Sequence, residues 1–182
     1  MNKKILVIGG SNREDSISRK VSKAFEKLAG DDVEFVIADI SKLPLFSQDL
    51  ESQNPEYLKD WKEQINNADA VLFITPEHNR SIPAALKNAI DWASRPYPDN
   101  TWAGKPTAIA GCSPSPLGAF GAVQDLRKLA SFLNMFVLPQ PEFYLAQAHT
   151  KFNEEGELID KNTEEYIINF WRAFRIWIDK VK

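Results

Sequence analysis

The sequence predicts an α/β fold, in which parallel strands form a central sheet and helices cover both of its faces. Short apolar runs alternate five times with stretches whose apolar residues recur every three or four positions. The first and third runs are continuously apolar, which is typical of strands buried on both faces of a parallel sheet. Alternation of this kind favours a doubly wound sandwich with right-handed crossovers.

Each of the five predicted strands is short and runs into a loop. The first leads into Gly9-Gly10, the third into Thr75-Pro76, and the last into Pro139. Glycine and proline at these points are the residues that end strands and begin loops. The predicted strands span residues 5–8, 33–37, 70–74, 107–110 and 136–138.

Five helices are predicted from the i, i+3, i+4, i+7 spacing of apolar residues. The C-terminal stripe carries the most Trp and Phe, and we expect it to cover one face of the sheet. The alternative interpretation is that the aromatic residues of this C-terminal stripe contact a cofactor. Residues 95–106 and 150–162 predict an irregular loop and a turn or short hairpin. The helical stripes lie at residues 21–28, 58–68, 86–93, 126–133 and 167–181.

Composition excludes several classes of protein. A chain of 182 residues with 43% hydrophobic content predicts a single domain, residues 1–182, with a substantial core. One cysteine excludes a disulfide scaffold, and two histidines far apart leave little for a zinc site. A net charge of −3 argues against nucleic-acid binding. No apolar run is long enough for a membrane span or a secretory signal, so we expect a cytoplasmic protein with no membrane partner.

The loop after the first strand carries the features of a phosphate site. Ligands of open α/β sheets bind beyond the carboxyl ends of the strands, where the strand order reverses. Here the sequence GGSNREDSIS supplies glycines for a tight turn, three hydroxyls, the cation of Arg13 and the start of a helix. The alternative is a capped turn with Ser16 or Ser18 as the helix N-cap. Glu14 and Asp15 oppose an anion unless they face solvent.

Several other chemistries lack their motifs in this loop. The sequence contains no G-x-x-x-x-G-K-[ST] loop of a nucleoside triphosphatase and no G-x-G-x-x-G dinucleotide pattern. No cysteine precedes Arg13, which excludes the loop of a thiol phosphatase, and no G-x-S-x-G elbow is present.

The loops after the third and fourth strands predict two walls of a flat cleft. Ser81 is the predicted N-cap of the following helix, with Pro83 in the first turn. Without a partner in the sequence, His78 is interpreted as a positioning residue rather than a general base, and Glu77 has no second carboxylate at a useful spacing. Cys112 has no flanking cation and no resolving cysteine, which disfavours a redox nucleophile.

Taken together, these segments resemble the NAD(P)H-dependent FMN reductase family, the flavodoxin-like group that includes bacterial chromate and quinone reductases. The family's first loop has Gly-Ser, then Arg, then Ser, which corresponds to Gly10-Ser11, Arg13 and Ser16. Its most specific pattern, T-P-E-Y-N-x-S-x-P-x-x-L-K-N-A-I-D-W, matches residues 75–92 except at His78.

Two shorter segments extend the resemblance, which covers about residues 4–145. Leu43-Pro44-Leu45-Phe46 is similar to the family's loop after the second strand, and Lys105-Pro106 also fits. Two departures stand out: the family usually has Asn where this chain has Ser18, and Tyr where it has His78.

The resemblance implies a flavodoxin-like three-layer sandwich whose five-stranded parallel sheet has the order 2-1-3-4-5. It also implies bound FMN, with NADPH or NADH as electron donor. Because a flavin carries the chemistry itself, we expect neither a catalytic side chain nor a metal. The implied cofactor-binding residues are Ser11, Arg13, Ser16, Ile17, Ser18, Pro76, Glu77, His78, Asn79, Cys112 and Ser113.

The expected activity is a ping-pong oxidoreduction in which hydride passes through FMN to a small-molecule acceptor. Quinones, azo and nitro compounds, metal oxyanions and free flavin are all candidate acceptors. The resemblance further implies a homodimer or tetramer. Two alternatives remain open: a flavodoxin-type electron carrier, which is usually more acidic, and a flavin-free regulator.

Overall fold

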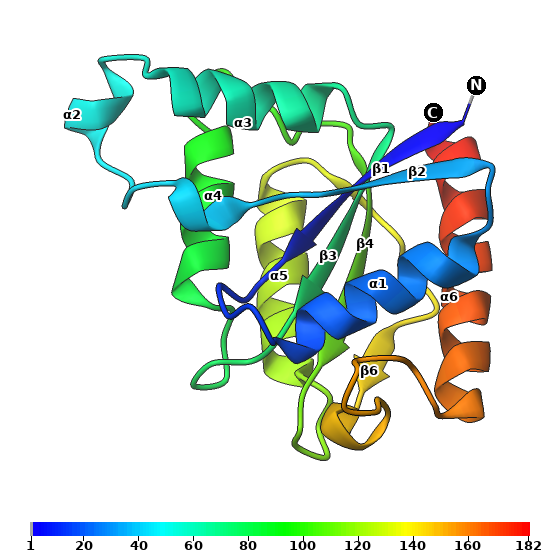
Figure 1. Ribbon diagram of the computed structural model, residues 1–182. Helices are drawn as coiled ribbons and strands as arrows, with labels where there is room; N and C mark the ends of the chain where they lie inside the picture. The colour runs from blue at the N-terminus through cyan, green and yellow to red at the C-terminus, as the bar shows by residue number, and fades with distance from the viewer. Residues whose placement is uncertain (1) are drawn as a thin grey trace.

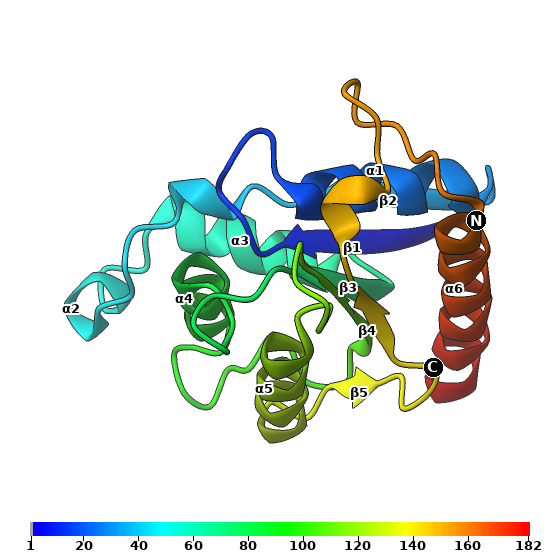
Figure 2. The same ribbon diagram turned by 90° about the horizontal axis from the view of Figure 1, so that it is seen from below.

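The computed structural model describes residues 2–182 as a six-stranded parallel sheet covered by helices on both faces (Figures 1 and 2). The strand order is β2-β1-β3-β4-β5, and β6 also pairs with β4. This order and the three-layer arrangement confirm the fold predicted from the sequence. The strands are β1 (Lys3–Gly9), β2 (Val33–Ile37), β3 (Ala70–Thr75), β4 (Pro106–Cys112), β5 (Phe136–Val137) and β6 (Phe143–Leu145).

Each of the five predicted helical stripes lies on a helix. Helices α1 and α6 cover one face of the sheet, and α3, α4 and α5 cover the other. The helices are α1 (Ile17–Ala29), α2 (Gln48–Glu51), α3 (Glu56–Asn66), α4 (Ala84–Ala93), α5 (Phe120–Phe132) and α6 (Lys161–Val181), with 3₁₀ turns η1 (Ile40–Lys42) and η2 (Ala148–Thr150).

Strand β6 was not expected from the sequence. The strand predicted at residues 136–138 corresponds to β5, which pairs with the start of β4, whereas β6 follows it and pairs with the end of β4. Pro139 and Pro141 lie between β5 and β6, and proline has no N–H to donate to a neighbouring strand. The three residues of β6 are too short a run to be recognised by periodicity.

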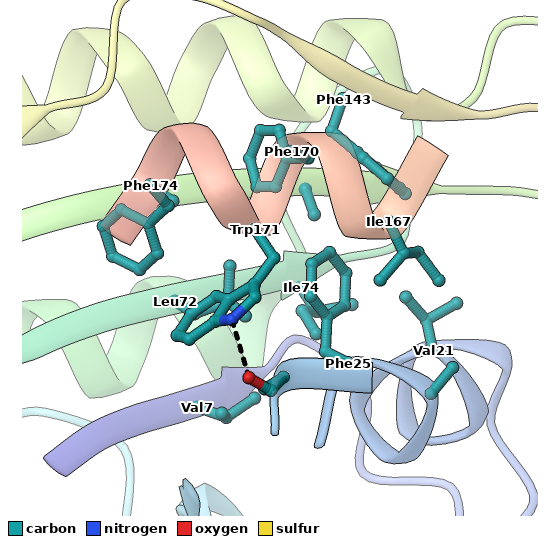
Figure 3. Packing of buried hydrophobic residues seen from close by; sticks show 14 of the residues in the cluster. Val7, Val21, Phe25, Leu72, Ile74, Phe143, Ile167, Phe170, Trp171 and Phe174 are labelled. Carbon is teal, nitrogen blue, oxygen red and sulfur yellow. Dashed lines mark hydrogen bonds between the residues drawn. The ribbon is translucent and has the colours of Figure 1, made fainter. Parts of the chain in front are cut away.

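The aromatic stripe of α6 is buried in the core (Figure 3). Phe170 packs against Phe25 and Phe143 with ring centroids 6.0 and 5.1 Å away, and Trp171 donates Nε1–H to the Ala29 carbonyl at 3.2 Å. Burying a side chain of this size contributes about 1.5–3 kcal/mol. Core packing is therefore confirmed for the stripe, in preference to contact with a cofactor.

Pairing of β1, β3 and β4 brings the ends of these strands to one edge of the sheet. Gly9 is aligned with Ile74, and Thr75 with Gly111. Because all three strands are parallel, the loops that follow them leave the sheet side by side. This edge is where open α/β sheets bind ligands.

At the opposite edge, Asp69 joins the beginnings of two strands to the C-terminus. Its backbone N–H donates to the Lys4 carbonyl, and its carboxylate accepts from the Lys4 N–H, both at 2.7 Å. Lys182 also donates to this carboxylate, and that hydrogen bond holds the pKa of Asp69 below its usual range. Figure 1 shows both termini at this edge.

We expect Asp69→Asn to lower the stability at neutral pH. Since 35% of the Asp69 side chain is exposed, screening keeps the loss near that of a surface ion pair, about 0.2–1 kcal/mol. A carboxyl whose pKa is lowered by folding stabilises fully above the unfolded pKa, so the loss should begin to shrink as the pH falls below about 4 and should disappear as the pH passes through the lower pKa of the folded protein. Urea denaturation of the wild type and of Asp69→Asn at pH 7 and pH 3 measures this loss of stability.

The matched control is Asp31→Asn, which removes the same charge from a side chain that has no ion pair among residues 2–182. This variant should show no such pH-dependent difference. An equal loss of stability at pH 7 and pH 3 for Asp69→Asn would contradict the proposed role of the charge.

Candidate cofactor-binding site

A cleft of about 390 Å³ lies at the carboxyl ends of β1, β3 and β4, within the size range of cofactor pockets. All the site residues predicted from the sequence line it except Asn79. The cleft joins four segments of the chain that are distant in sequence. The lining residues are Ser11, Arg13, Asp15, Ser16, Ile17, Ser18, Lys20, Pro76, Glu77, His78, Cys112, Ser113, Pro114, His149 and Phe152.

The loop after β1 lies directly against the loop after β3. Gly10 donates its N–H to the Ile74 carbonyl at 2.9 Å, and a Cβ at Gly10 would come within 2.9 Å of Pro76 Cδ. A larger residue would therefore push the two loops apart.

Ser16 caps helix α1 and leaves donors free for an anion. Its Oγ accepts from the Arg19 N–H at 3.2 Å and from the Ser18 hydroxyl at 3.3 Å, which confirms Ser16 as the N-cap. The cap uses the oxygen of Ser16 as an acceptor, so its hydroxyl proton remains available. The N–H groups of Ile17 and Ser18 find no acceptor among residues 2–182. Capping and anion binding are thus compatible here.

The acidic residues of this loop form no ion pair with Arg13. Asp15 forms an ion pair with Lys20 at 2.8 Å, and the hydrogen bond from Lys20 lowers the pKa of Asp15. Glu14 is exposed and lies outside the cleft lining. The Arg13 guanidinium forms no ion pair in the part of the chain that the structure describes. The electrostatics of this end of the cleft suit an anionic ligand.

The loop after β3 is a tight turn. His78 and Ser81 exchange two backbone hydrogen bonds of 3.0 Å, and the residues between them, Asn79 and Arg80, have φ of 51° and 66°. Two consecutive residues with positive φ are typical of a type I′ turn, and Asn tolerates this conformation. The turn presents residues 76–78 to the cleft and carries Asn79 out of the lining.

Glu77 fastens this loop to helix α5. Its carboxylate accepts from the Ala122 N–H at 3.2 Å and forms an ion pair with Arg80 at 3.3 Å, and only 10% of the side chain is exposed. No side chain at the start of α5 itself caps the helix, so Glu77 supplies a missing acceptor. Gly121 permits this approach, since a Cβ there would lie 2.6 Å from the Arg80 carbonyl oxygen.

Ser81 holds the same loop at a second point, which corrects its predicted role. Helix α4 begins at Ala84 with Pro83 as N-cap, so the prediction of Ser81 as N-cap was wrong. The Ser81 hydroxyl instead donates to Asp125 of α5 at 2.6 Å, and this bond lowers the pKa of Asp125. Ser81 closes the turn with His78 and is therefore too early in the chain to cap α4.

Part of the long sequence motif serves a neighbouring loop. Asn88 accepts from the Phe46 N–H at 2.8 Å and donates to the Pro44 carbonyl at 2.9 Å. Trp92 donates its Nε1–H to the same carbonyl at 2.7 Å. These side chains fix the loop after β2 onto α4 without contributing to the lining of the cleft.

The thiol of Cys112 lies at the floor of the cleft and is not activated. Burial raises the pKa of Cys112 to about 12, so the thiol stays protonated at neutral pH. Beside it, Ser113 Oγ accepts from the Ser115 N–H at 3.1 Å. The structure thus gives no support to Cys112 as a redox nucleophile.

Five lining residues were not among the predicted contacts. Asp15, Lys20 and Pro114 lie in or next to the predicted loops, whereas His149 and Phe152 come from a part of the chain that the sequence analysis did not assign to the site. They belong to the segment after β6, which is held against the loop after β4 by a hydrogen bond from the Ala148 N–H to the Ser113 carbonyl at 2.9 Å. No motif marks these residues, and they could not be placed because β6 itself was not expected.

No group of three or more His, Cys, Asp or Glu among residues 2–182 is arranged to hold a metal ion. None of the helices in this range is both long and apolar enough to cross a bilayer.

Comparisons with known proteins identify the family. The sequence profile of the NADPH-dependent FMN reductase family matches residues 3–150. A quinone reductase of Pseudomonas putida is 43% identical, over 96% of this chain and 94% of its own length. A 2-hydroxy-1,4-benzoquinone reductase of a Burkholderia species is 39% identical, over 96% of both chains.

Among solved structures, the flavoenzyme NAD(P)H:(acceptor) oxidoreductase FerB of Paracoccus denitrificans superposes with a TM-score of 0.91, at 40% identity and 98% coverage of each chain. A flavodoxin variant of Pseudomonas aeruginosa, at 16% identity and a TM-score of 0.60, shares the fold. The resemblance inferred from the sequence is confirmed, and this chain belongs to the NADPH-dependent FMN reductase family.

Proposed function

We propose that this chain is an FMN-dependent oxidoreductase that passes two electrons from NADPH or NADH to a quinone. Family membership supports the reaction class, and the names of the Pseudomonas and Burkholderia relatives support the acceptor. The observation that carries the proposal is the cleft. It brings the unpaired N–H groups at the start of α1 and the unpaired guanidinium of Arg13 together with the rigid loop at residues 76–78.

One end of the cleft fits the phosphate of FMN. The free N–H groups of Ile17 and Ser18, the hydroxyl protons of Ser11 and Ser16, and the guanidinium of Arg13 are all donors. A phosphomonoester offers only acceptors, and the start of a helix favours negative charge. The donor set and the ligand are therefore complementary.

The other end of the cleft fits the flavin ring. Pro76, Glu77 and His78 line it from one loop, and Cys112 and Ser113 from another. The polar edge of the ring needs hydrogen-bonding groups at fixed positions, and the two backbone bonds between His78 and Ser81 fix this loop. The protonated thiol of Cys112 adds no charge beneath the ring.

FMN, when bound, accepts a hydride and passes two electrons on. The residues of this chain bind and orient it, and we assign no side chain as a catalytic acid or base. Glu77 is the one carboxylate that the sequence suggested as a catalytic group. Its oxygens instead accept from the Ala122 N–H of α5 and form an ion pair with Arg80.

We also propose that residues 1–182 form one FMN-binding domain that assembles as a homodimer or tetramer in the cytoplasm. One sheet carries every strand among residues 2–182, which supports a single domain. Exposed aromatic side chains such as Phe132, 87% exposed, support self-association. Nucleic acid and membranes are not among the proposed partners.

The proposed function is tested by the visible spectrum of the purified protein. We expect a yellow protein whose flavin absorbance bleaches on anaerobic addition of NADPH or NADH, and returns on addition of a benzoquinone. Bleaching that requires a separate reductase would instead indicate an electron carrier. Absence of flavin, with no FMN uptake on titration, would indicate a flavin-free regulator and contradict the proposal.

Arg13→Ala should weaken FMN binding by about 1.5–3 kcal/mol, the range for a hydrogen bond to a charged group. The apoprotein is titrated with FMN and quenching of flavin fluorescence is followed. The control is Arg172→Ala, which removes an exposed cation of α6 outside the cleft and should bind FMN as the wild type does. Unchanged affinity in Arg13→Ala would show that the phosphate end is misassigned.

Glu77→Ala should both destabilise the apoprotein and weaken FMN binding, because the loop at residues 76–78 loses its attachment to α5. Loss of a helix cap costs about 0.5–2 kcal/mol. Glu77→Gln, which keeps an acceptor for the Ala122 N–H, should retain most of both properties. Urea denaturation and FMN titration measure them. A Glu77→Ala protein of reduced stability but unchanged FMN affinity would rule out a positioning role.

A further inference from the structure

We propose that Lys20 is a second cation of the phosphate end of the cleft, and that Asp15 withholds it from the ligand. The carboxylate of Asp15 then competes with the FMN phosphate for the Lys20 ammonium, so the chain binds FMN less tightly than it would without Asp15. The inference rests on the proposed function and names two residues that determine how strongly the phosphate end binds.

The ammonium of Lys20 is placed beside the loop after β1 by a direct contact. Lys20 belongs to the first turn of α1, where its N–H donates to the Ser16 carbonyl at 3.1 Å. Side chains of a helix point back toward the start of that helix. Accordingly, Lys20 Nζ lies 2.8 Å from the carboxylate of Asp15, the residue immediately before the N-cap Ser16. The cation is thus at the end of α1 where the N–H groups of Ile17 and Ser18 are unpaired.

The stem of Lys20 is packed, which keeps its charge at this end of the cleft. A Cβ at Gly156 would lie 3.5 Å from both Cγ and Cε of Lys20, so the turn that contains Gly156 covers the aliphatic part of the side chain. Only 25% of the Lys20 side chain is exposed. A lysine covered along its stem presents mainly its ammonium, and here Lys20 is part of the cleft lining.

The carboxylate of Asp15 belongs to the cleft without being buried in it. Asp15 is part of the lining, yet 78% of its side chain is exposed. The hydrogen bond from Lys20, followed by the charge of Lys20, holds the pKa of Asp15 below its usual range, and the charge of Arg13 adds a smaller effect in the same direction. Asp15 is therefore ionised at neutral pH and interacts with both cations of this end.

An exposed carboxylate is a weak competitor for a cation when the other anion carries more charge. A solvent-exposed ion pair gains little, because water and salt screen it. A phosphomonoester carries up to about two negative charges near neutral pH and presents three acceptor oxygens. Bound at the start of α1, next to Asp15 in the chain, the phosphate attracts Lys20 at the expense of the existing pair. The pair therefore lowers the affinity for FMN without preventing its binding.

The other carboxylates near the cleft have no such role. Asp15 and Glu77 are the two carboxylates of the lining, and Glu77 is bound to the Ala122 N–H and to Arg80. Glu14, the neighbour of Asp15, is exposed, lies outside the lining and forms no ion pair among residues 2–182. Glu14 therefore offers a control of equal charge in the same loop.

The experiment measures the dissociation constant of FMN at pH 7 and fixed ionic strength for the apoproteins of the wild type, Asp15→Asn, Lys20→Gln, the double variant and Glu14→Gln. We expect Asp15→Asn to bind FMN about three- to tenfold more tightly than the wild type, and Lys20→Gln about three- to tenfold more weakly. In the Lys20→Gln background, Asp15→Asn should change the affinity by about twofold at most, because no cation remains to be released. Glu14→Gln should also stay within about twofold of the wild type.

Riboflavin, which lacks the phosphate, separates an effect on the phosphate from an effect on the loop. All of these proteins should bind riboflavin equally well. A changed riboflavin affinity in Asp15→Asn would show that the substitution alters the loop itself, and would contradict the inference.

Unchanged FMN affinity in Asp15→Asn, with FMN still bound, would overturn the inference and leave the proposed function intact. An equal gain from Asp15→Asn with and without Lys20 would mean that the carboxylate repels the phosphate directly, which also overturns the inference. A gain of the same size in Glu14→Gln would do so too, because it would indicate a general effect of charge. Failure of the wild type to bind FMN would refute the proposed function, and the inference with it.

Discussion

The cleft depends on the approach of helix α5 to the loop after β3. Glu77 supplies the acceptor that the start of α5 lacks, and Gly121 leaves the space that the Arg80 carbonyl occupies. A second bond, from Ser81 to Asp125, ties the same loop to the next turn of α5. The loop at residues 76–78 is thus held by a helix on one face of the sheet, while the loop after β1 leads into α1 on the other face. The sheet between them sets the spacing of the two ends.

The reactive side chains near the cleft have structural roles. Glu77 is bound to α5, and Cys112 is buried as a neutral thiol. Such a site is suited to a cofactor that brings its own redox chemistry, because the protein then needs only to bind and orient it. The low content of Cys and His in the sequence agrees with this division of labour.

Most of the fold was predictable from the sequence because its signals are local. Continuous apolar runs mark β1 and β3, and helical spacing marks α1 and α3–α6. The motif at residues 75–92 located the site, but the spacing could not reveal that Asn88 and Trp92 hold the loop after β2 or that Ser81 bonds to α5. These contacts join residues more than 40 positions apart. The short strand β6 carried too little pattern to be recognised, and His149 was missed with it.

The central claim is that segments far apart in the sequence form one binding site for FMN. Amide hydrogen exchange of the apoprotein with and without FMN tests this claim most directly, since it reports on each segment separately. Our account predicts slower exchange on FMN binding in residues 11–19, 76–81, 112–115 and 145–152, and little change at the Asp69 edge of the sheet. Protection confined to one of these segments, or concentrated in another part of the chain such as the hollow between α1 and residues 155–158, would contradict it.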